Sequence, residues 1–483
     1  MKTTKNENKK NFIGNIKASF SGRKFRSGAY ATILSVVVII IVLVVNMLVS
    51  KMNIQFDLSS QSMYTLTQDT KDYVKDLKDD ITIYYMVQQG NETSEFDKIS
   101  KLYDSLSKKI TVVEKDPLLY PAFSKTFVDD DITQNSFIVV NNTNKRAKYI
   151  AGSDMLVTEM DYQTYQSKTT GIDVEGKLTS AIQYVTTDKL PTMYEIDGHG
   201  ETASSDTFKA TLAKMNIELK TLSTLSQSTM PEDCDLLYIN APQKDFSDDE
   251  TKMIKDYLTK GGKAIITLDF NASTLTNFLS ILDYYGIEMV NGIVEEGDSN
   301  HFYAGHPDWI LPTIESHDIT TKVEAGNIPA FLPISSGLIL ADTTRSSLKV
   351  EPLFTTSDSS YSMVNAASTA TTKEDGDIDG PFNLGLVATD TYNNVTSNIV
   401  VFSSAYTFTD DTADYGNTAL LTGTVGFLSG DKGTLSIPTK SYNDSMLVTT
   451  QLQFITWGGF VALGIPLIII IFGGVICYRR RRK

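Results

Sequence analysis

Apolar residues occur in two patterns along this chain: as uninterrupted runs near both ends, and at periodic spacings between them. Residues 29–49 and 454–478 contain no Asp, Glu, Lys, Arg or His. At 1.5 Å per residue, each run spans about 30 Å as a helix, which is the thickness of the hydrocarbon core of a bilayer. The pattern therefore predicts one transmembrane helix at residues 29–50 and a second at 454–478.

The first run differs from a cleaved signal peptide, because its apolar core is longer than about 7–15 residues and no small-residue cleavage site follows it. We therefore expect an uncleaved anchor. The basic residues lie on the outer sides of both runs, in tails at 1–28 and 479–483. The positive-inside rule then predicts a multi-pass protein of the plasma membrane, with both tails cytoplasmic and residues 51–453 extracytoplasmic.

Residues 51–189 show a strand–helix–strand pattern followed by strand–strand–helix. Residues 81–86 are β-branched and aromatic, which is typical of a strand, and the apolar residues of 95–108 recur at helical spacing. The other predicted elements are strands at 110–113, 137–140 and 147–150, the last two forming a hairpin, and a helix at 178–185. This order predicts a thioredoxin-like α/β domain at 51–189. Its redox Cys pair is missing, so no redox chemistry is expected.

Residues 190–450 alternate strand and helix patterns more regularly. Apolar runs at 234–239 and 264–268 are typical of strands buried on both faces of a sheet, and Ser247 is placed to cap the helix between them. The other predicted elements are strands at 192–196 and 217–222 and helices at 207–215 and 275–285. Such alternation predicts a parallel, doubly wound sheet, so the expected fold class is α/β throughout.

The periodic pattern weakens after about residue 291. Residues 300–380 are expected to form a divergent insertion in the second domain, within which the polar segment 355–380 is a mobile loop or an insertion of its own. Short apolar segments at 384–387 and 399–403 are expected to return to the same sheet as additional strands.

Charge and cysteine usage narrow the classes of function. The two tails hold 13 of the 43 basic residues, whereas the region between them holds 57 of the 58 acidic ones. So acidic a region argues against nucleic-acid binding, which needs concentrated Lys and Arg. The two cysteines, Cys234 and Cys477, are not expected to pair, because the second lies in an apolar run. A large extracytoplasmic region without disulfides suits a bacterium.

Two segments resemble ligand-binding motifs only in part. Residues 171–179 nearly spell a phosphate-binding loop, but Leu178 replaces the hydroxyl residue that Mg²⁺ needs. His301, His306, Asp308 and His317 fit no standard metal-site spacing, so they are interpreted as a polar loop. No Gly-x-Ser-x-Gly motif is present. The sequence therefore predicts no catalytic centre, no metal and no cofactor.

One segment lies where an open α/β sheet tends to bind ligands. Asp197, His199 and Glu201 follow a predicted strand and precede a helix, and Asp269 ends another predicted strand. A His between carboxylates is able to bind metal or to move protons. The alternative is a Gly-rich turn whose side chains cap the next helix, and this is favoured because only one His lies there. These four residues are the candidate ligand or partner crevice.

Four segments together resemble one family. They are YTLTQDTKDYVKDL (64–77), VEGKLTSAIQYV (174–185), YEIDGHGE (194–201) and the 238–269 stretch. In this order they are similar to the GldG-like family of ABC-transporter auxiliary proteins, first named for gliding motility. Lys177 stands where the family pattern has Glu after Gly, whereas the G-H-G-E motif matches in full. The resemblance covers about 55–290 and the apolar runs.

The resemblance implies a non-enzymatic partner of separate ATPase and permease subunits, with an amidotransferase-like second domain that lacks catalytic residues. The leading hypothesis is accordingly an extracytoplasmic accessory subunit of a bacterial ABC transport complex. A homo-oligomer is compatible with the sequence as well. Two alternatives stay open: a membrane-anchored ligand sensor or hydrolase that uses the Asp197–Glu201 crevice, and a purely structural envelope protein.

Overall fold

The computed structural model describes most of the region between the apolar runs. The described residues are 62–442, apart from 162–165, 228, 304, 327, 342–344, 366–371, 431–434 and 436, together with 34, 36–44, 47, 460–464, 466, 471 and 473. Contacts divide the chain into two compact units, residues 1–63 and residues 64–483. We call the described part of the second unit up to residue 442 the body.

The two predicted transmembrane helices lie for the most part outside the described residues. Within the first run, residues 36–44 are helical, and within the second, Phe460–Gly464 form a turn of π-helix. Among the residues that the structure describes, no helix is both long enough and apolar enough to cross a membrane.

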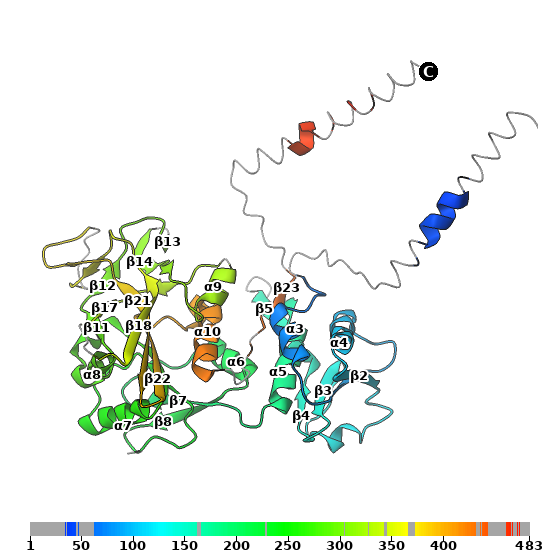
Figure 1. The fold of residues 1–483 in the computed structure, drawn as a ribbon, viewed down its shortest axis with the longest axis horizontal. Helices are drawn as coiled ribbons and strands as arrows, with labels where there is room; N and C mark the ends of the chain where they lie inside the picture. Colours follow the sequence, from blue (N-terminus) through cyan, green and yellow to red (C-terminus); the bar gives the residue numbers. More distant parts are fainter. Residues whose placement is uncertain are drawn as a thin grey trace, which may run out of the picture. The chain divides into compact units, whose positions relative to one another are not determined.

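A four-stranded sheet forms the amino-terminal part of the body. Its strand order is β2-β1-β3-β4, in which β1 and β2 are parallel and β3 is antiparallel to both of its neighbours. The strands are β1 (Ile81–Met86), β2 (Ile110–Lys115), β3 (Ser136–Asn141) and β4 (Ala147–Ile150). Helices α4 (Ser94–Leu106) and α5 (Val174–Thr186) contact one another, and α3 (Gln68–Lys75) contacts α4 (Figure 1). The predicted β-α-β order and the β3–β4 hairpin are confirmed, but two further strands come between this hairpin and α5.

A smaller sheet joins distant parts of the chain. Strands β5 (Leu156–Asp161) and β6 (Gln166–Ile172) form a hairpin that the sequence analysis did not predict. The short strand β23 (Lys440–Ser441) pairs with β6 in the antiparallel direction. The end of the body is therefore attached to its amino-terminal part (Figure 1).

A ten-stranded sheet forms the rest of the body. Its main path is β11-β17-β21-β22-β10-β9-β7-β8, and β15 and β18 extend it through β21. Strands β22, β10, β9, β7 and β8 are parallel, whereas β11, β17, β18 and β21 pair in the antiparallel direction. The parallel strands are β7 (Thr192–Asp197), β8 (Glu218–Ser223), β9 (Leu236–Asn240), β10 (Lys263–Thr267) and β22 (Val395–Phe402). The remaining strands are β11 (Ile287–Val290), β15 (Thr313–Ile314), β17 (Gly337–Leu340), β18 (Leu348–Thr355) and β21 (Asn383–Tyr392).

Helices cover both faces of this sheet, and each face has its own core (Figure 1). Leu236 and Tyr238 of β9 pack with α6 (Asp206–Lys214) and α10 (Asn417–Ser429). The alternate residues Leu237 and Ile239 pack with α7 (Asp248–Thr259) and α8 (Thr276–Tyr284). Successive side chains of a strand point to opposite faces, so a strand buried on both faces is apolar throughout. The sheet is therefore doubly wound, as the apolar runs predict.

The segment between β10 and β21 is more ordered than the predicted insertion. Strand β18 belongs to the large sheet. Two small sheets flank it, β12-β19-β20 and β13-β14-β16. Their elements are β12 (Ile293–Glu295), β13 (Phe302–Tyr303), β14 (His306–Ile310), β16 (Leu332–Pro333), β19 (Tyr361–Met363) and β20 (Ile378–Asp379), and α9 (Thr321–Gly326) lies between β15 and β16 along the chain. The prediction that the chain then returns to the sheet is confirmed by β21 and β22.

Candidate functional site

The G-H-G-E segment follows β7 at a characteristic point of the sheet. Along the chain, the parallel strands β7, β8, β9 and β10 occupy the spatial order β8-β7-β9-β10. The chain passes from β7 to β8 on one side of β7, and then from β8 to β9 on its other side. The topological switch point therefore lies between β7 and β9. In open α/β sheets, ligands bind beyond the carboxyl ends of the strands at this point. The segment thus lies at the edge where this type of fold places a site.

Glu201 folds the segment into a tight loop. Its Oε2 accepts hydrogen bonds from the backbone N–H of Gly198 (3.1 Å) and of His199 (2.8 Å). Gly198 and Gly200 have φ angles of +135° and +74°, which L side chains rarely adopt. The carbonyl of His199 in turn accepts from the backbone N–H groups of Gln243 and Lys244, both at 2.9 Å. The loop after β9 is thereby joined to the loop after β7.

The imidazole of His199 is enclosed between two carboxylates. Its exposed fraction is 4%. Nδ1 lies 3.5 Å from Oε1 of Glu201, and Nε2 lies 3.4 Å from Oε2 of Glu250. The ring of Phe246 meets the imidazole edge to face, at 4.6 Å between centroids. The ring therefore links the loop to the amino end of α7.

Glu250 is also part of the cap of α7. Ser247 and Glu250 form a capping box, in which the Ser247 N–H donates to Oε2 of Glu250 at 2.8 Å. Burial raises the pKa of Glu250, but hydrogen bonds from the backbone N–H and the hydroxyl of Ser247, with the nearby His199, outweigh it. The net result is a lowered pKa, so this carboxylate is held in its charged form.

The side chains of this cluster are enclosed by one another. The side chains of His199 and Glu201 are buried, and each imidazole nitrogen faces a carboxylate rather than a Ser or Cys nucleophile. Within the described ranges, no group of three or more His, Cys, Asp or Glu side chains is arranged to hold a metal ion. The polar atoms His199 Nδ1, Glu201 Oε1 and Glu250 Oε1 have no hydrogen-bond partner among the described residues. The cluster is thus tightly packed, although some of its polar atoms lack a hydrogen-bond partner among the described residues.

The structure separates the four predicted crevice residues. His199 and Glu201 lie together, whereas Asp197 is exposed at the end of β7. Asp269 caps the following 3₁₀ helix (Phe270–Thr274), since its Oδ1 accepts from the N–H of Asn271 at 2.8 Å. Glu250, which the sequence analysis did not single out, completes the cluster. Its signal is the S-x-x-E spacing from Ser247, which marks a capping box but not a neighbour of His199.

The other three histidines have separate surroundings. His306 stacks on Trp309 at 4.3 Å, and His317 Nδ1 accepts from the N–H of Ile319 at 3.1 Å. Nδ1 of His301 lies 3.3 Å from the carbonyl oxygen of Leu311. Each ring has a local packing or hydrogen-bonding role, so they do not form one site.

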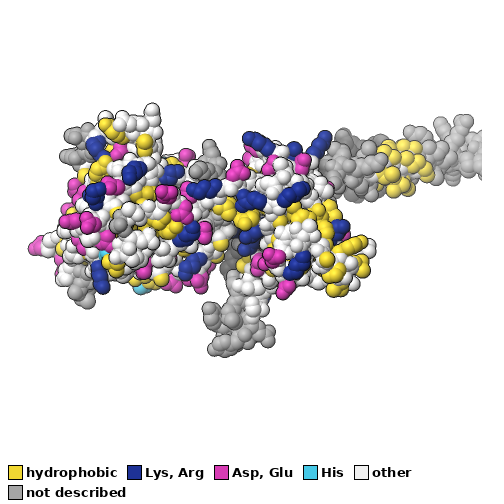
Figure 2. Space-filling view, turned by 90° about the horizontal axis from the view of Figure 1, so that it is seen from below, with side chains coloured by type: hydrophobic (Ala, Val, Ile, Leu, Met, Phe, Trp, Pro, Cys, Tyr) yellow, Lys and Arg dark blue, Asp and Glu magenta, His cyan; other side chains and the backbone are white. Residues whose placement is uncertain are grey.

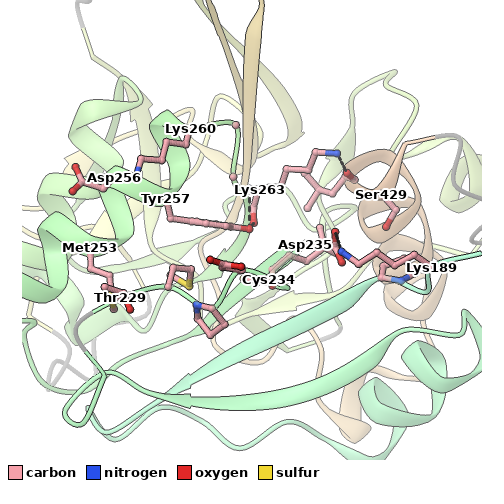
Figure 3. A pocket seen from close by; sticks show the side chains of 18 residues that line it. Lys189, Thr229, Cys234, Asp235, Met253, Asp256, Tyr257, Lys260, Lys263 and Ser429 are labelled. Carbon is pink, nitrogen blue, oxygen red and sulfur yellow. Dashed lines mark hydrogen bonds and ion pairs between the residues drawn. The ribbon is translucent and has the colours of Figure 1, made fainter.

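A pocket of about 740 Å³ opens at the opposite, amino-terminal edge of the parallel strands. Pro191 precedes β7, Asp235 precedes β9 and Lys263 begins β10, and all three line it. Figure 3 shows Asp256 of α7 and Lys260, just after this helix, on one side, with Lys189 and Asp235 opposite them. Lys189 Nζ lies 3.5 Å from Oδ1 of Asp235. The volume is in the range of small-molecule sites.

Several polar groups in this pocket are held in neutral or hydrogen-bonded forms. Burial is the main cause that raises the pKa of the Cys234 thiol, to about 11. Tyr257 donates its hydroxyl to the carbonyl of Lys263 at 3.2 Å, and Lys263 Nζ donates to the carbonyl of Leu428 at the end of α10 (Figure 3). A protonated thiol is a poor nucleophile. The pocket therefore offers space without an activated group.

The surface carries both signs of charge. Lys and Arg side chains are scattered among Asp and Glu over the visible face of the body (Figure 2). Some of the Lys side chains form exposed ion pairs with Asp, such as Lys252–Asp256 and Lys75–Asp72. Nucleic-acid binding needs a basic face, and this face has no continuous one.

The fold and this site define an α/β protein with a doubly wound sheet whose usual ligand edge is filled by its own side chains. The chain belongs to a family of auxiliary proteins of ABC transport systems: the family model described as "ABC-type uncharacterized transport system" matches residues 179–424, just over half of the chain. Residues 60–157 match a domain of unknown function, DUF7088. No curated protein matches.

Several solved structures resemble parts of the chain at low identity. The mmIFT52 N-terminal domain is 17% identical, with a TM-score of 0.38, and the match covers 50% of this chain and 98% of that one. A glutamine amidotransferase from Thermotoga maritima is 11% identical over 50% and 99% of the two chains, with a TM-score of 0.27. A ThuA-like protein from Parabacteroides merdae is 11% identical over 53% and 98%, with a TM-score of 0.29.

Proposed function

We propose that this chain is a non-catalytic, extracytoplasmic accessory subunit of a bacterial ABC transport complex. The apolar runs at 29–50 and 454–478 anchor it in the plasma membrane, with both tails in the cytoplasm. It associates there with separate permease and ATPase subunits. The observation that carries the proposal is the family match, which covers the whole parallel part of the large sheet.

The closed switch point supports the non-catalytic part of the proposal. A hydrolase or sensor at the Asp197–Glu201 crevice needs a ligand to reach His199 or Glu201, and both are buried. Each of them also has a task in the fold, because Glu201 holds the loop and His199 contacts the cap of α7. The geometry therefore gives no support to the alternative of a ligand sensor or hydrolase at this crevice.

The proposal extends to the two α/β parts of the body. The β2-β1-β3-β4 sheet is proposed to be a thioredoxin-like domain at 51–189 that serves as a scaffold, since it lacks a Cys pair. The large sheet is proposed to be an amidotransferase-like domain that has lost its catalytic residues. Both parts would then present surfaces to the transporter rather than process a substrate.

Purification from membranes tests this proposal. A tagged full-length chain, extracted from its native host in mild detergent, is expected to bring down an ATPase and a polytopic permease. Recovery of this chain alone, as a monomer or as a homo-oligomer, would contradict the proposal.

A further inference from the structure

A buried ion pair joins three distant parts of the chain. Glu175, in the first turn of α5, is 2% exposed, and Lys440, in β23, is 7% exposed. Lys440 Nζ lies 2.9 Å from Oε2 of Glu175 and donates to the carbonyl of Thr65 at 2.6 Å. The other carboxylate oxygen of Glu175 accepts from the N–H (2.6 Å) and the hydroxyl (2.7 Å) of Thr67. We call Thr65, Thr67, Glu175 and Lys440 the joint.

The joint connects the beginning of the body to its end. Thr65 and Thr67 lie just after residue 64, where the body begins, and Lys440 lies two residues before its last described residue. Backbone pairing supports the end as well, because the Tyr442 N–H donates to the carbonyl of Thr170 in β6 at 2.7 Å. Two segments about 375 residues apart are therefore fixed to one helix.

A hydrogen-bonded layer lies beneath the joint. The hydroxyl of Tyr103, in α4, donates to the Glu175 carbonyl at 3.0 Å and lies 2.7 Å from the hydroxyl of Thr179. Thr179 in turn lies 3.2 Å from the hydroxyl of Thr70. All three side chains are fully buried. They hold α3, α4 and α5 in the register that presents Glu175 to Thr67.

The same helix is joined to α6, which packs on the large sheet, by a second pair. Asp173, just before α5, lies 3.1 Å from Lys214 of α6. Asn216, at the end of that helix, donates to the carbonyl of Ser180 at 2.8 Å. Helix α5 thus contacts the beginning of the body, its end and helix α6.

Burial makes the Glu175–Lys440 pair different from a surface pair. Removing one member of a buried pair leaves an uncompensated charge, which is strongly destabilising, whereas exposed pairs contribute little. Lys322–Asp69 is an exposed pair near the beginning of the body, at 3.2 Å, with side chains 37% and 48% exposed. It offers a matched comparison, because it also connects α3 to the carboxy-terminal part of the body.

We propose that the Glu175–Lys440 pair is the device that holds the two ends of the body together. It connects the YTLT and VEGKLTSA segments, which are far apart in the sequence: Thr67 comes from the first and Glu175 and Thr179 from the second. If the apolar runs are anchors, which rests on the proposed function, both anchors are followed or preceded along the chain by segments that the joint holds. Movement of either anchor is then passed to α5.

Hydrogen exchange on the full-length chain in detergent tests the joint. Lys440→Met is expected to accelerate exchange in peptides covering 437–442 and 66–70 about a hundredfold, while β9 and β10 keep their protection. Glu175→Gln combined with Lys440→Met is expected to restore part of the protection, because no charge is then left buried alone. Lys322→Met, the matched control, is expected to change exchange less than about threefold.

Two outcomes would overturn the proposal. One is that Lys440→Met leaves the exchange of 437–442 unchanged, and the other is that it accelerates β9 and β10 equally, which indicates general destabilisation. If Lys440→Met fails to fold, the double variant gives the same decision by comparison with Glu175→Gln alone: equal exchange in the two would refute coupling. Because exchange is measured on the isolated chain, it does not depend on whether a permease and an ATPase co-purify.

Discussion

The two edges of the parallel strands differ in a way that the fold class alone does not suggest. At the carboxyl edge, where doubly wound proteins usually bind ligands, His199, Glu201 and Glu250 fill the switch point. At the amino edge, a pocket of about 740 Å³ is open, but its cysteine is held as a thiol. The cluster of titratable side chains is thus buried at one edge, and the cavity described above lies at the other. Residues of the types that form functional sites, at the position where this fold usually has one, thus stabilise the fold here.

Cysteine labelling gives the largest expected effect at the amino edge. In a Cys477→Ser background, Cys234 is expected to react with iodoacetamide at pH 7 about a hundredfold more slowly than a cysteine placed by Tyr392→Cys, because only the thiolate is nucleophilic and the pKa of Cys234 is about 11. Tyr392 is 69% exposed, which makes its position a suitable control. Equal rates would reveal an activated thiol and would reverse the comparison.

At the carboxyl edge, His199→Ala is expected to lower the free energy of unfolding by about 3 kcal/mol, because it leaves a cavity and two buried carboxylates without their neighbour. Urea denaturation of the purified chain measures the change. His306→Ala, at an exposed ring, is expected to cost less than about 1 kcal/mol. Similar losses of unfolding free energy for the two variants would show that the buried cluster at the switch point does not stabilise the fold.

Acid stability distinguishes the edges further. The pKa of Glu250 is lower in the folded protein than its ordinary value of 4.5, so its contribution is present above that value and is lost as the pH falls through the folded pKa. Glu250→Gln is expected to be about 1 kcal/mol less stable than the parent chain at pH 7, with the difference shrinking below pH 4.5. Urea midpoints from pH 7 to pH 3 measure it. A difference that grows toward acid pH would contradict the assigned direction.

The smallest effect is expected in the wall of the pocket. Ser429 is 7% exposed and its hydroxyl has no hydrogen-bond partner among the described residues. Ser429→Ala removes an unsatisfied polar group, so it is expected to leave the free energy of unfolding unchanged or to raise it by about 0.5 kcal/mol. A loss above about 1 kcal/mol in the same denaturation experiment would indicate that the pocket wall is as tightly built as the switch point.

Local sequence signals predicted the elements that position the site. The apolar run at 264–268 was correctly assigned to a strand, here Lys263–Thr267, because a strand buried on both faces has no polar position. The helix beginning after Ser247 was predicted from its cap, and it begins at Asp248. The return of residues 399–403 to the same sheet was also predicted, since β22 pairs with β10. Each of these features is encoded within a few residues.

Contacts between distant segments were not predictable in the same way. Helix α10 was missed, because three Thr and two Gly lower the helix propensity of its 13 residues, and packing against α6 and α9 overrides this low propensity. Glu250 lies about 50 residues from His199, so no local pattern connects them. The pocket was missed for the same reason, because its lining comes from the ends of β9, β10, α7 and α10.

The neighbouring strands β10 and β22 have a consequence for how the chain is made. Ala264 pairs with Ile399, so more than a hundred residues must be synthesised after β10 before its partner exists. During that interval β8, β7, β9 and β10 are able to assemble, but β10 presents Ile265 and Ile266 along an open edge, which is prone to associate with other chains. Closing so long a loop is also slow. A nascent chain that has reached residue 300 is therefore expected to need protection that the finished protein does not.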